Sequence, residues 1–182
     1  MKLITDADGA PIVYPRLHTL ALRSFCDYAA LETSSLDTPG GTPFPALEKL
    51  IIHVPYLFGN DVLLRGSEKS LRVLDMHVNH EMLDTLSRCG VFDKGRFKAL
   101  DYLNMVNWNF SSDWVTESQG LGVFDAFCTT SVLNLGVLFD LSFDRIEPYI
   151  GDFSRTLRVL NTPSLSCTLE QVVTLIQSLP FL

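Results

Sequence analysis

The chain has 182 residues, of which 47% are hydrophobic and 19% are charged, and its formal net charge is −7. A composition with so many apolar and so few charged residues requires a buried core, which excludes intrinsic disorder. The lysines and arginines are scattered singly and form no basic stripe that could neutralise a phosphate backbone, so we expect no nucleic-acid partner.

The N-terminal segment turns acidic at Asp6 and Asp8 and has no apolar stretch typical of a secretory signal. No apolar run approaches the roughly 20 residues that span a bilayer. The four cysteines have neither the paired spacing of a zinc site nor the density of a disulfide framework; they are Cys26, Cys89, Cys128 and Cys167. These features predict a cytoplasmic or nuclear protein with reduced thiols, no membrane partner, no metal and no other cofactor.

One short phrase recurs along the chain: an apolar residue, two variable residues, a leucine, one variable residue and a further apolar residue. Its six copies begin at Leu17, Leu47, Leu71, Leu100, Thr130 and Leu157, so neighbouring copies start 24 to 30 residues apart. The alternation within each copy has a period of two. It therefore predicts six short strands, with variable residues on one face and the six central leucines in one buried column on the other.

Helical segments are expected between these strands. The clearest are Asn79–Ser87, where Asn79 can cap the start and Gly90 can supply the stop, and Thr168–Ser178, which opens on a capping box. Weaker candidates are Cys26–Leu31, Asn60–Leu64, Ser112–Glu117 and Phe143–Tyr149, and residues 38–43 read as a turn-rich loop. Strand and helix alternating with a fixed period predict parallel strands joined by crossovers. A doubly wound α/β domain would also alternate in this way, but it does not account for the recurring phrase.

The six phrases resemble the leucine-rich-repeat family over nearly the whole chain. The unequal repeat lengths and the openings Tyr14-Pro-Arg-Leu17 and Phe44-Pro-Ala-Leu47 are most similar to the repeat regions of fungal F-box and leucine-rich-repeat proteins. The resemblance implies an α/β fold, namely a leucine-rich-repeat solenoid (horseshoe) with a parallel concave sheet and convex helices. It implies a single array of about six repeats over residues 1–182, part of a longer solenoid, with no F-box segment before Leu17. The family's asparagine after the last leucine is kept only at Asn79, which leaves the repeat subtype open.

The resemblance further implies a non-catalytic scaffold that binds another protein through its concave face. One such role is the substrate-recognition part of an F-box-type ubiquitin ligase. The residues between and after the leucines would lie on that face. The candidate partner-binding residues are Lys49, His53, Asp75, His77, Tyr102, Asn104, Asn134 and Asn161.

Two polar features of this face have a functional and a structural interpretation. One is a run of an acid and three amides, Asp75, Asn104, Asn134 and Asn161. The other is a basic corner, Arg23, Lys49, His53 and His77. Either could contact a partner. Alternatively, the amides could bond to one another across strands about 4.8 Å apart, and the basic residues could form a solvated patch.

An enzyme whose site is assembled from loops is the alternative function. His77 and His80 could form half of a metal site, but no third ligand stands at a recognisable spacing. The sequence also lacks a glycine-rich phosphate loop, a Gly-x-Ser-x-Gly elbow and an HExxH motif. We therefore expect no catalytic residues and no enzymatic activity.

The C-terminal residues Leu179–Leu182 resemble the opening of a further phrase and carry no polar cap. A terminal repeat without a cap leaves its stacking surface in water. Exposed leucines beside an open strand edge favour association. We therefore expect fraying of this end or self-association through it.

Overall fold

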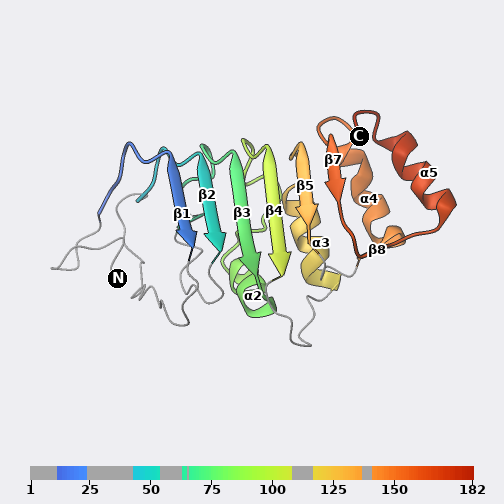
Figure 1. Cartoon of the computed structure of the whole chain (residues 1–182), viewed down its shortest axis with the longest axis horizontal. Coiled ribbons are helices and arrows are strands. Elements are labelled where there is room, and N and C mark those ends of the chain that lie inside the picture. Colours follow the sequence, from blue (N-terminus) through green and yellow to red (C-terminus); the bar gives the residue numbers. More distant parts are fainter. Residues whose placement is uncertain (1–11, 24–42, 54–62, 65, 108–116, 137–140) are drawn as a thin grey trace.

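A computed structural model describes residues 12–23, 43–53, 63–64, 66–107, 117–136 and 141–182. Over these residues the protein is an α/β structure, in which six parallel strands form one sheet and, from β3 onward, a helix lies between each strand of this sheet and the next. The sheet is shown in Figure 1, with its strands following one another from the N-terminal to the C-terminal end. The α/β class and the parallel pairing agree with the sequence prediction.

Each of the six phrases forms one strand of the sheet. The strands are β1 (Thr19–Arg23), β2 (Lys49–His53), β3 (Val73–Val78), β4 (Tyr102–Asn107), β5 (Val132–Leu135) and β7 (Val159–Asn161). The described residues also include a two-stranded pair, β6 (Leu141–Ser142) with β8 (Leu165–Ser166). The order β1-β2-β3-β4-β5-β7 has no reversal, whereas a doubly wound sheet reverses its strand order at a switch point. The doubly wound alternative therefore does not describe this sheet.

The central leucines of the six phrases align across the sheet in one column. The paired residues are Leu20, Leu50, Leu74, Leu103, Leu133 and Leu160. The four inner members are completely buried, but Leu20 and Leu160 are only partly buried. The prediction of six buried leucines is therefore wrong at both ends. Each end strand has a neighbour on one side only, so its leucine is covered on one side only.

The two best-marked helices begin where the sequence predicts. In α2 (His80–Arg88), the Asn79 side chain accepts a 2.8 Å hydrogen bond from the amide of Met82. Gly90, after the last turn, has φ of 67°, which glycine adopts without strain. In α5 (Leu169–Ser178), Thr168 and Gln171 form the predicted capping box.

The other two helices extend beyond the predicted bounds. Of the predicted segment Ser112–Glu117 only Glu117 is described, and it begins α3 (Glu117–Ala126). Helix α4 spans Phe143–Phe153 rather than ending at Tyr149. Both continue because buried side chains hold them against the core, including Val123 and Phe124 in α3 and Ile150 and Phe153 in α4. Of the predicted segment Asn60–Leu64, only Leu63 and Leu64 are described, and both are helical and buried. The predicted segment Cys26–Leu31 and residues 38–42 of the predicted loop lie outside the described residues.

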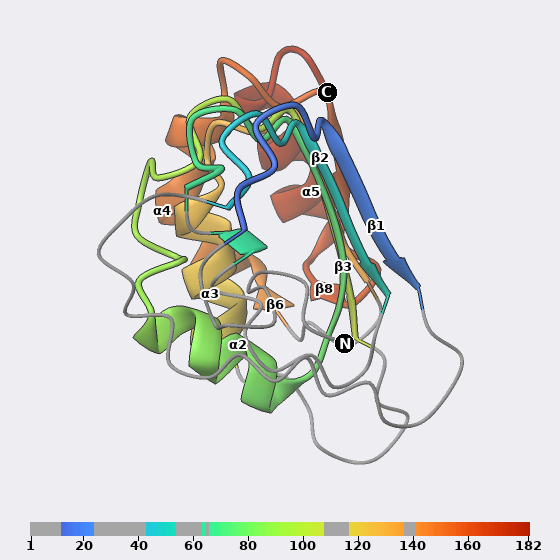
Figure 2. The same cartoon turned by 90° about the vertical axis from the view of Figure 1, so that its left-hand side faces the viewer.

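The core lies between the sheet and the helices. Figure 2 shows α2, α3 and α4 on one side of the sheet, and none of the described helices covers the opposite face. Successive helices contact one another in chain order, α2 with α3, α3 with α4 and α4 with α5. Aromatic rings fill the layer beneath the sheet, with Phe124 4.8 Å from Phe153 and Phe97 5.8 Å from Phe127 between ring centroids. This arrangement leaves one broad face of the sheet for contacts with other molecules.

Candidate functional site

The face of the sheet away from the helices carries the candidate binding residues. Side chains alternate between the two faces of a strand. In β3, the half-buried Val73 and Asp75 alternate with the buried Leu74 and Met76. Because all the strands are parallel and in register, outward residues at equivalent positions form columns that cross the strands. We call this surface the open face.

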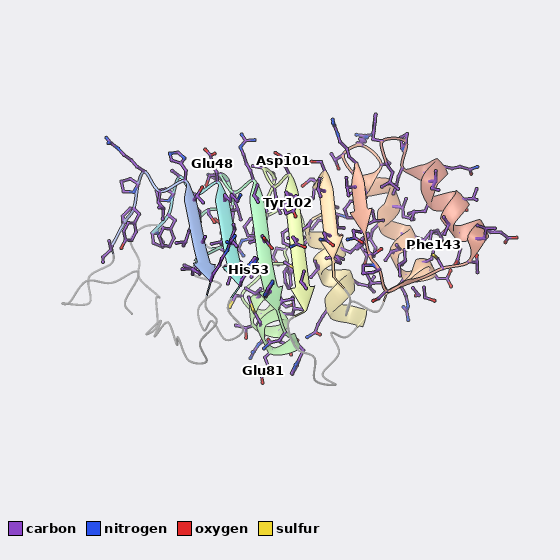
Figure 3. All side chains as sticks on the ribbon, viewed as in Figure 1. Glu48, His53, Glu81, Asp101, Tyr102 and Phe143 are labelled. Atoms are coloured by element: carbon purple, nitrogen blue, oxygen red, sulfur yellow. The ribbon has the colours of Figure 1, made fainter. Side chains whose placement is uncertain are left out.

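The first column of the open face is largely apolar. It pairs Lys49 with Val73, Val73 with Tyr102, Tyr102 with Val132 and Val132 with Val159. Lys49 and Val159 are exposed, and the three residues between them are half-buried. We call the stretch formed by Val73, Tyr102, Val132 and Val159 the apolar column. Figure 3 labels Tyr102 on β4, in the middle of the sheet.

The second column is a chain of hydrogen-bonded side chains. The Asn134 Nδ2 group donates to Asn104 Oδ1 at 2.7 Å, and Asn104 Nδ2 donates to Asp75 Oδ1 at 2.7 Å. The same Asp75 oxygen lies 3.1 Å from His53 Nε2, an ion pair when the histidine is protonated, although this approach lacks hydrogen-bond geometry. We call His53, Asp75, Asn104 and Asn134 the polar ladder. Hydrogen bonding between the amides is the structural interpretation of this run, and these distances confirm it as far as Asn134.

The polar ladder ends on an unsatisfied acceptor. Asn134 Oδ1 is buried and accepts no hydrogen bond from any residue that the structure describes. The next residue in register is Asn161, which is exposed on the edge strand β7. A buried carbonyl oxygen without a donor costs free energy. The ladder therefore ends at β5 with one hydrogen-bonding group unused.

Two histidines stack near the C-terminal ends of β2 and β3. The rings of His53 and His77 are 4.1 Å apart between centroids and only 10° from parallel. Burial lowers the pKa of His77, and the neighbouring His53 lowers it further, whereas Asp75 acts in the opposite direction. The predicted basic corner is therefore wrong for His77, because burial favours its neutral form. Arg23, which is exposed and in register with His53, supplies permanent positive charge there, whereas Lys49 lies at the opposite end of β2.

The lowered pKa of His77 predicts a pH-dependent stability. Below about pH 6.5, the ordinary histidine pKa, the unfolded chain binds this proton more readily than the folded chain, so stability falls as the pH falls. His77→Gln should flatten this dependence when urea midpoints are compared at about pH 7.5 and about pH 5.5, on either side of that value. An equal pH dependence in wild type and His77→Gln would contradict the assignment.

The structure places the candidate residues in three columns of the open face. The first column contains Lys49 and Tyr102. The second contains Asp75, Asn104, Asn134 and Asn161, and the third contains His53 and His77, whose rings stack. The open face also carries three outward valines that are not among the predicted binding residues, namely Val73, Val132 and Val159. Their shared position before each central leucine was the signal for this column.

The described residues contain no group of three or more histidine, cysteine or acidic side chains that could hold a metal ion, so His77 and His80 gain no third ligand there. None of the described helices is both long and apolar enough to span a membrane. Compared with known proteins, the chain matches no family model, no curated protein and no solved structure. Its function must therefore be argued from its own geometry.

Proposed function

We propose that the chain is a leucine-rich-repeat type of solenoid that binds another protein through its open face and catalyses no reaction. The recurring phrase supports this proposal, because each copy supplies one strand and the strands follow one another in chain order. Stacked strand–helix units bury a shared leucine core and leave one sheet face for binding. The likeness to fungal F-box proteins suggests substrate recognition for a ubiquitin ligase as the form that this binding takes.

The observation that carries the proposal is the pair of columns on the open face. The apolar column offers Val73, Tyr102 and Val132 side by side, and tyrosine is enriched at interface hot spots. The polar ladder beside it ends on the unpaired oxygen of Asn134. A polypeptide segment matches both columns when it places apolar side chains over the first column and polar groups over the second. We infer that the partner presents such a segment.

The arrangement of polar groups favours binding over catalysis. An enzyme site needs groups that converge on one reacting atom, whereas the polar ladder runs in a line across three successive strands, from Asp75 through Asn104 to Asn134. Asp75 and Asn134 are each hydrogen-bonded to Asn104. The side chains are therefore fixed in position, which suits a preformed binding surface.

Peptide selection tests the proposal. Peptides enriched from a random display library on the wild-type chain should bind Val132→Asp at least about tenfold more weakly, since the new charge must be buried without a partner. Thr85→Asp adds the same charge at an exposed position of α2 and should bind as wild type. Fluorescence anisotropy with labelled peptides gives both affinities. Equal affinity for Val132→Asp and wild type would remove the open face as the binding surface.

A further inference from the structure

The permanent charges of the open face lie on its first three strands. Arg23 projects from β1, Lys49 from β2 and Asp75 from β3. The outward residues of β4, β5 and β7 carry no charge. They are Tyr102, Asn104, Val106, Val132, Asn134, Val159 and Asn161. The open face is therefore charged at one end of the sheet and neutral at the other.

The charged end is basic although the chain as a whole is acidic. The sequence has 21 acidic and 14 basic residues, yet Asp75 is the only acidic residue among the outward residues of the main sheet. Its carboxylate accepts a hydrogen bond from Asn104 and lies 3.1 Å from the His53 ring nitrogen. Lys49 and Arg23 are exposed and form no ion pair with any residue that the structure describes. Both cations can therefore pair with an anion from another molecule.

The charges around the open face do not reverse this balance. Glu48 and Asp101 stand just before β2 and β4 at the rim of the sheet (Figure 3). Glu48 Oε1 lies 3.3 Å from His18 Nδ1, and Asp101 Oδ2 lies 3.6 Å from Arg72 Nη1. Each acid at this rim thus faces a group that can carry the opposite charge. More distant charges are largely screened, because the Debye length is about 8 Å at an ionic strength of about 0.15 M.

We propose, on the basis of the proposed function, that the segment bound at the open face is acidic at one end and apolar at the other. Its carboxylates lie over β1 and β2, where they pair with Arg23 and Lys49. A lysine or arginine at the same place would be repelled by both cations. The apolar side chains of the segment lie over Val73, Tyr102 and Val132, where a charge would lose water without gaining a partner. The charge distribution therefore selects the composition of the partner and its orientation on the sheet.

The register of the strands sets the spacing of these groups in the partner. Lys49 and Tyr102 stand in one column, two strand spacings apart, which is about 10 Å. An extended segment that crosses the strands advances about 3.3 Å per residue, so its carboxylate lies about two to four residues from the side chain over Tyr102. Arg23, at the opposite end of the neighbouring strand, can pair with a second carboxylate.

Peptide selection on two forms of the chain tests the charge preference. Peptides enriched from a random display library on the wild-type chain should contain aspartate or glutamate more often than the unselected library does. These acidic residues should stand about two to four positions from an apolar residue. Peptides enriched on the variant with both Arg23→Glu and Lys49→Glu should contain lysine or arginine in their place, because the reversed charges repel carboxylates and attract cations.

Fluorescence anisotropy with the acidic peptides measures the effect of each cation. Lys49→Glu and Arg23→Glu should each weaken binding about fivefold to thirtyfold, because an attraction is replaced by a repulsion. Lys49→Arg keeps the charge and should bind as wild type. Arg88→Glu makes the same charge reversal at an exposed position of α2, on the other side of the sheet, and should also bind as wild type. Circular dichroism should show all variants folded, since the three positions are exposed.

Three results would overturn the acidic partner. Two are an enriched pool without an excess of acidic residues, and peptides that lose affinity for Val132→Asp but not for Lys49→Glu or Arg23→Glu. In both cases binding at the open face, and with it the proposed function, would stand. The third is equal weakening by Arg88→Glu, which would assign the effect to the net charge of the chain. If no peptide binds the open face, the proposed function fails and the acidic partner with it.

Discussion

Leu103→Ala should lower the free energy of unfolding by about 2 to 5 kcal/mol. Leu103 is completely buried on the central strand β4 and stands in register between Leu74 and Leu133. Strands on both sides and helices below hold the surrounding atoms, so the cavity left by the missing side chain cannot collapse. Urea unfolding followed by circular dichroism measures the change.

Leu160→Ala is the matched control for this substitution, because it removes the same atoms from the same column. Leu160 lies on the edge strand β7 and is only partly buried. Leu160→Ala should therefore lower the free energy of unfolding by clearly less than Leu103→Ala does. An equal decrease in the free energy of unfolding for both variants would contradict the deeper burial at the centre of the column.

Asn104→Ala should lower the free energy of unfolding by about 2 to 4 kcal/mol. The substitution removes one hydrogen bond to the Asp75 carboxylate and one from the Asn134 amide. A hydrogen bond to a charged group contributes about 1.5 to 3 kcal/mol and a neutral one about 0.5 to 1.5 kcal/mol. The loss reaches the upper part of this range if water cannot enter to satisfy the two groups left behind.

Asn161→Ala provides the comparison for Asn104. Asn161 stands in the same column but is exposed, so its truncation should change stability by no more than about 0.5 kcal/mol. A double-mutant cycle between Asp75→Ala and Asn104→Ala should give a coupling energy of about 0.5 to 3 kcal/mol. If Asn104→Ala lowers the free energy of unfolding as little as Asn161→Ala does, and shows no coupling to Asp75, the ladder contributes nothing to stability.

The sheet could be predicted from the sequence because the residues that specify each strand lie close together and recur in every phrase. The leucine at the fourth position of each phrase fixes which face of the strand is buried, and a slip of one residue would expose it. All six phrases carry this signal, so pairing them position by position also gives the register from Leu20 to Leu160. The helix caps at Asn79 and Thr168 were predictable for the same reason, since a cap involves residues only three positions apart.

Features that depend on tertiary packing could not be predicted in this way. Helix α3 contains Gly120 and Gly122, which have poor helix propensity, and its formation depends on the burial of Val123 and Phe124. The pKa of His77 is lowered by burial and by a histidine on another strand. The unsatisfied oxygen at Asn134 results from the geometry of three strands, although the run of amides itself was visible in the sequence.

The strictly sequential strand order has a consequence for folding kinetics. Every strand of the main sheet pairs only with the strands of the neighbouring phrases, so each pairing closes a loop of similar and moderate length. Folding of such a sheet can nucleate locally and extend outward. The six-residue pairing of β3 with β4 favours nucleation there, whereas β7 adds through only three residues. We therefore expect β7 and α5 to join late during refolding and to open first during unfolding, while the centre of the sheet retains its structure.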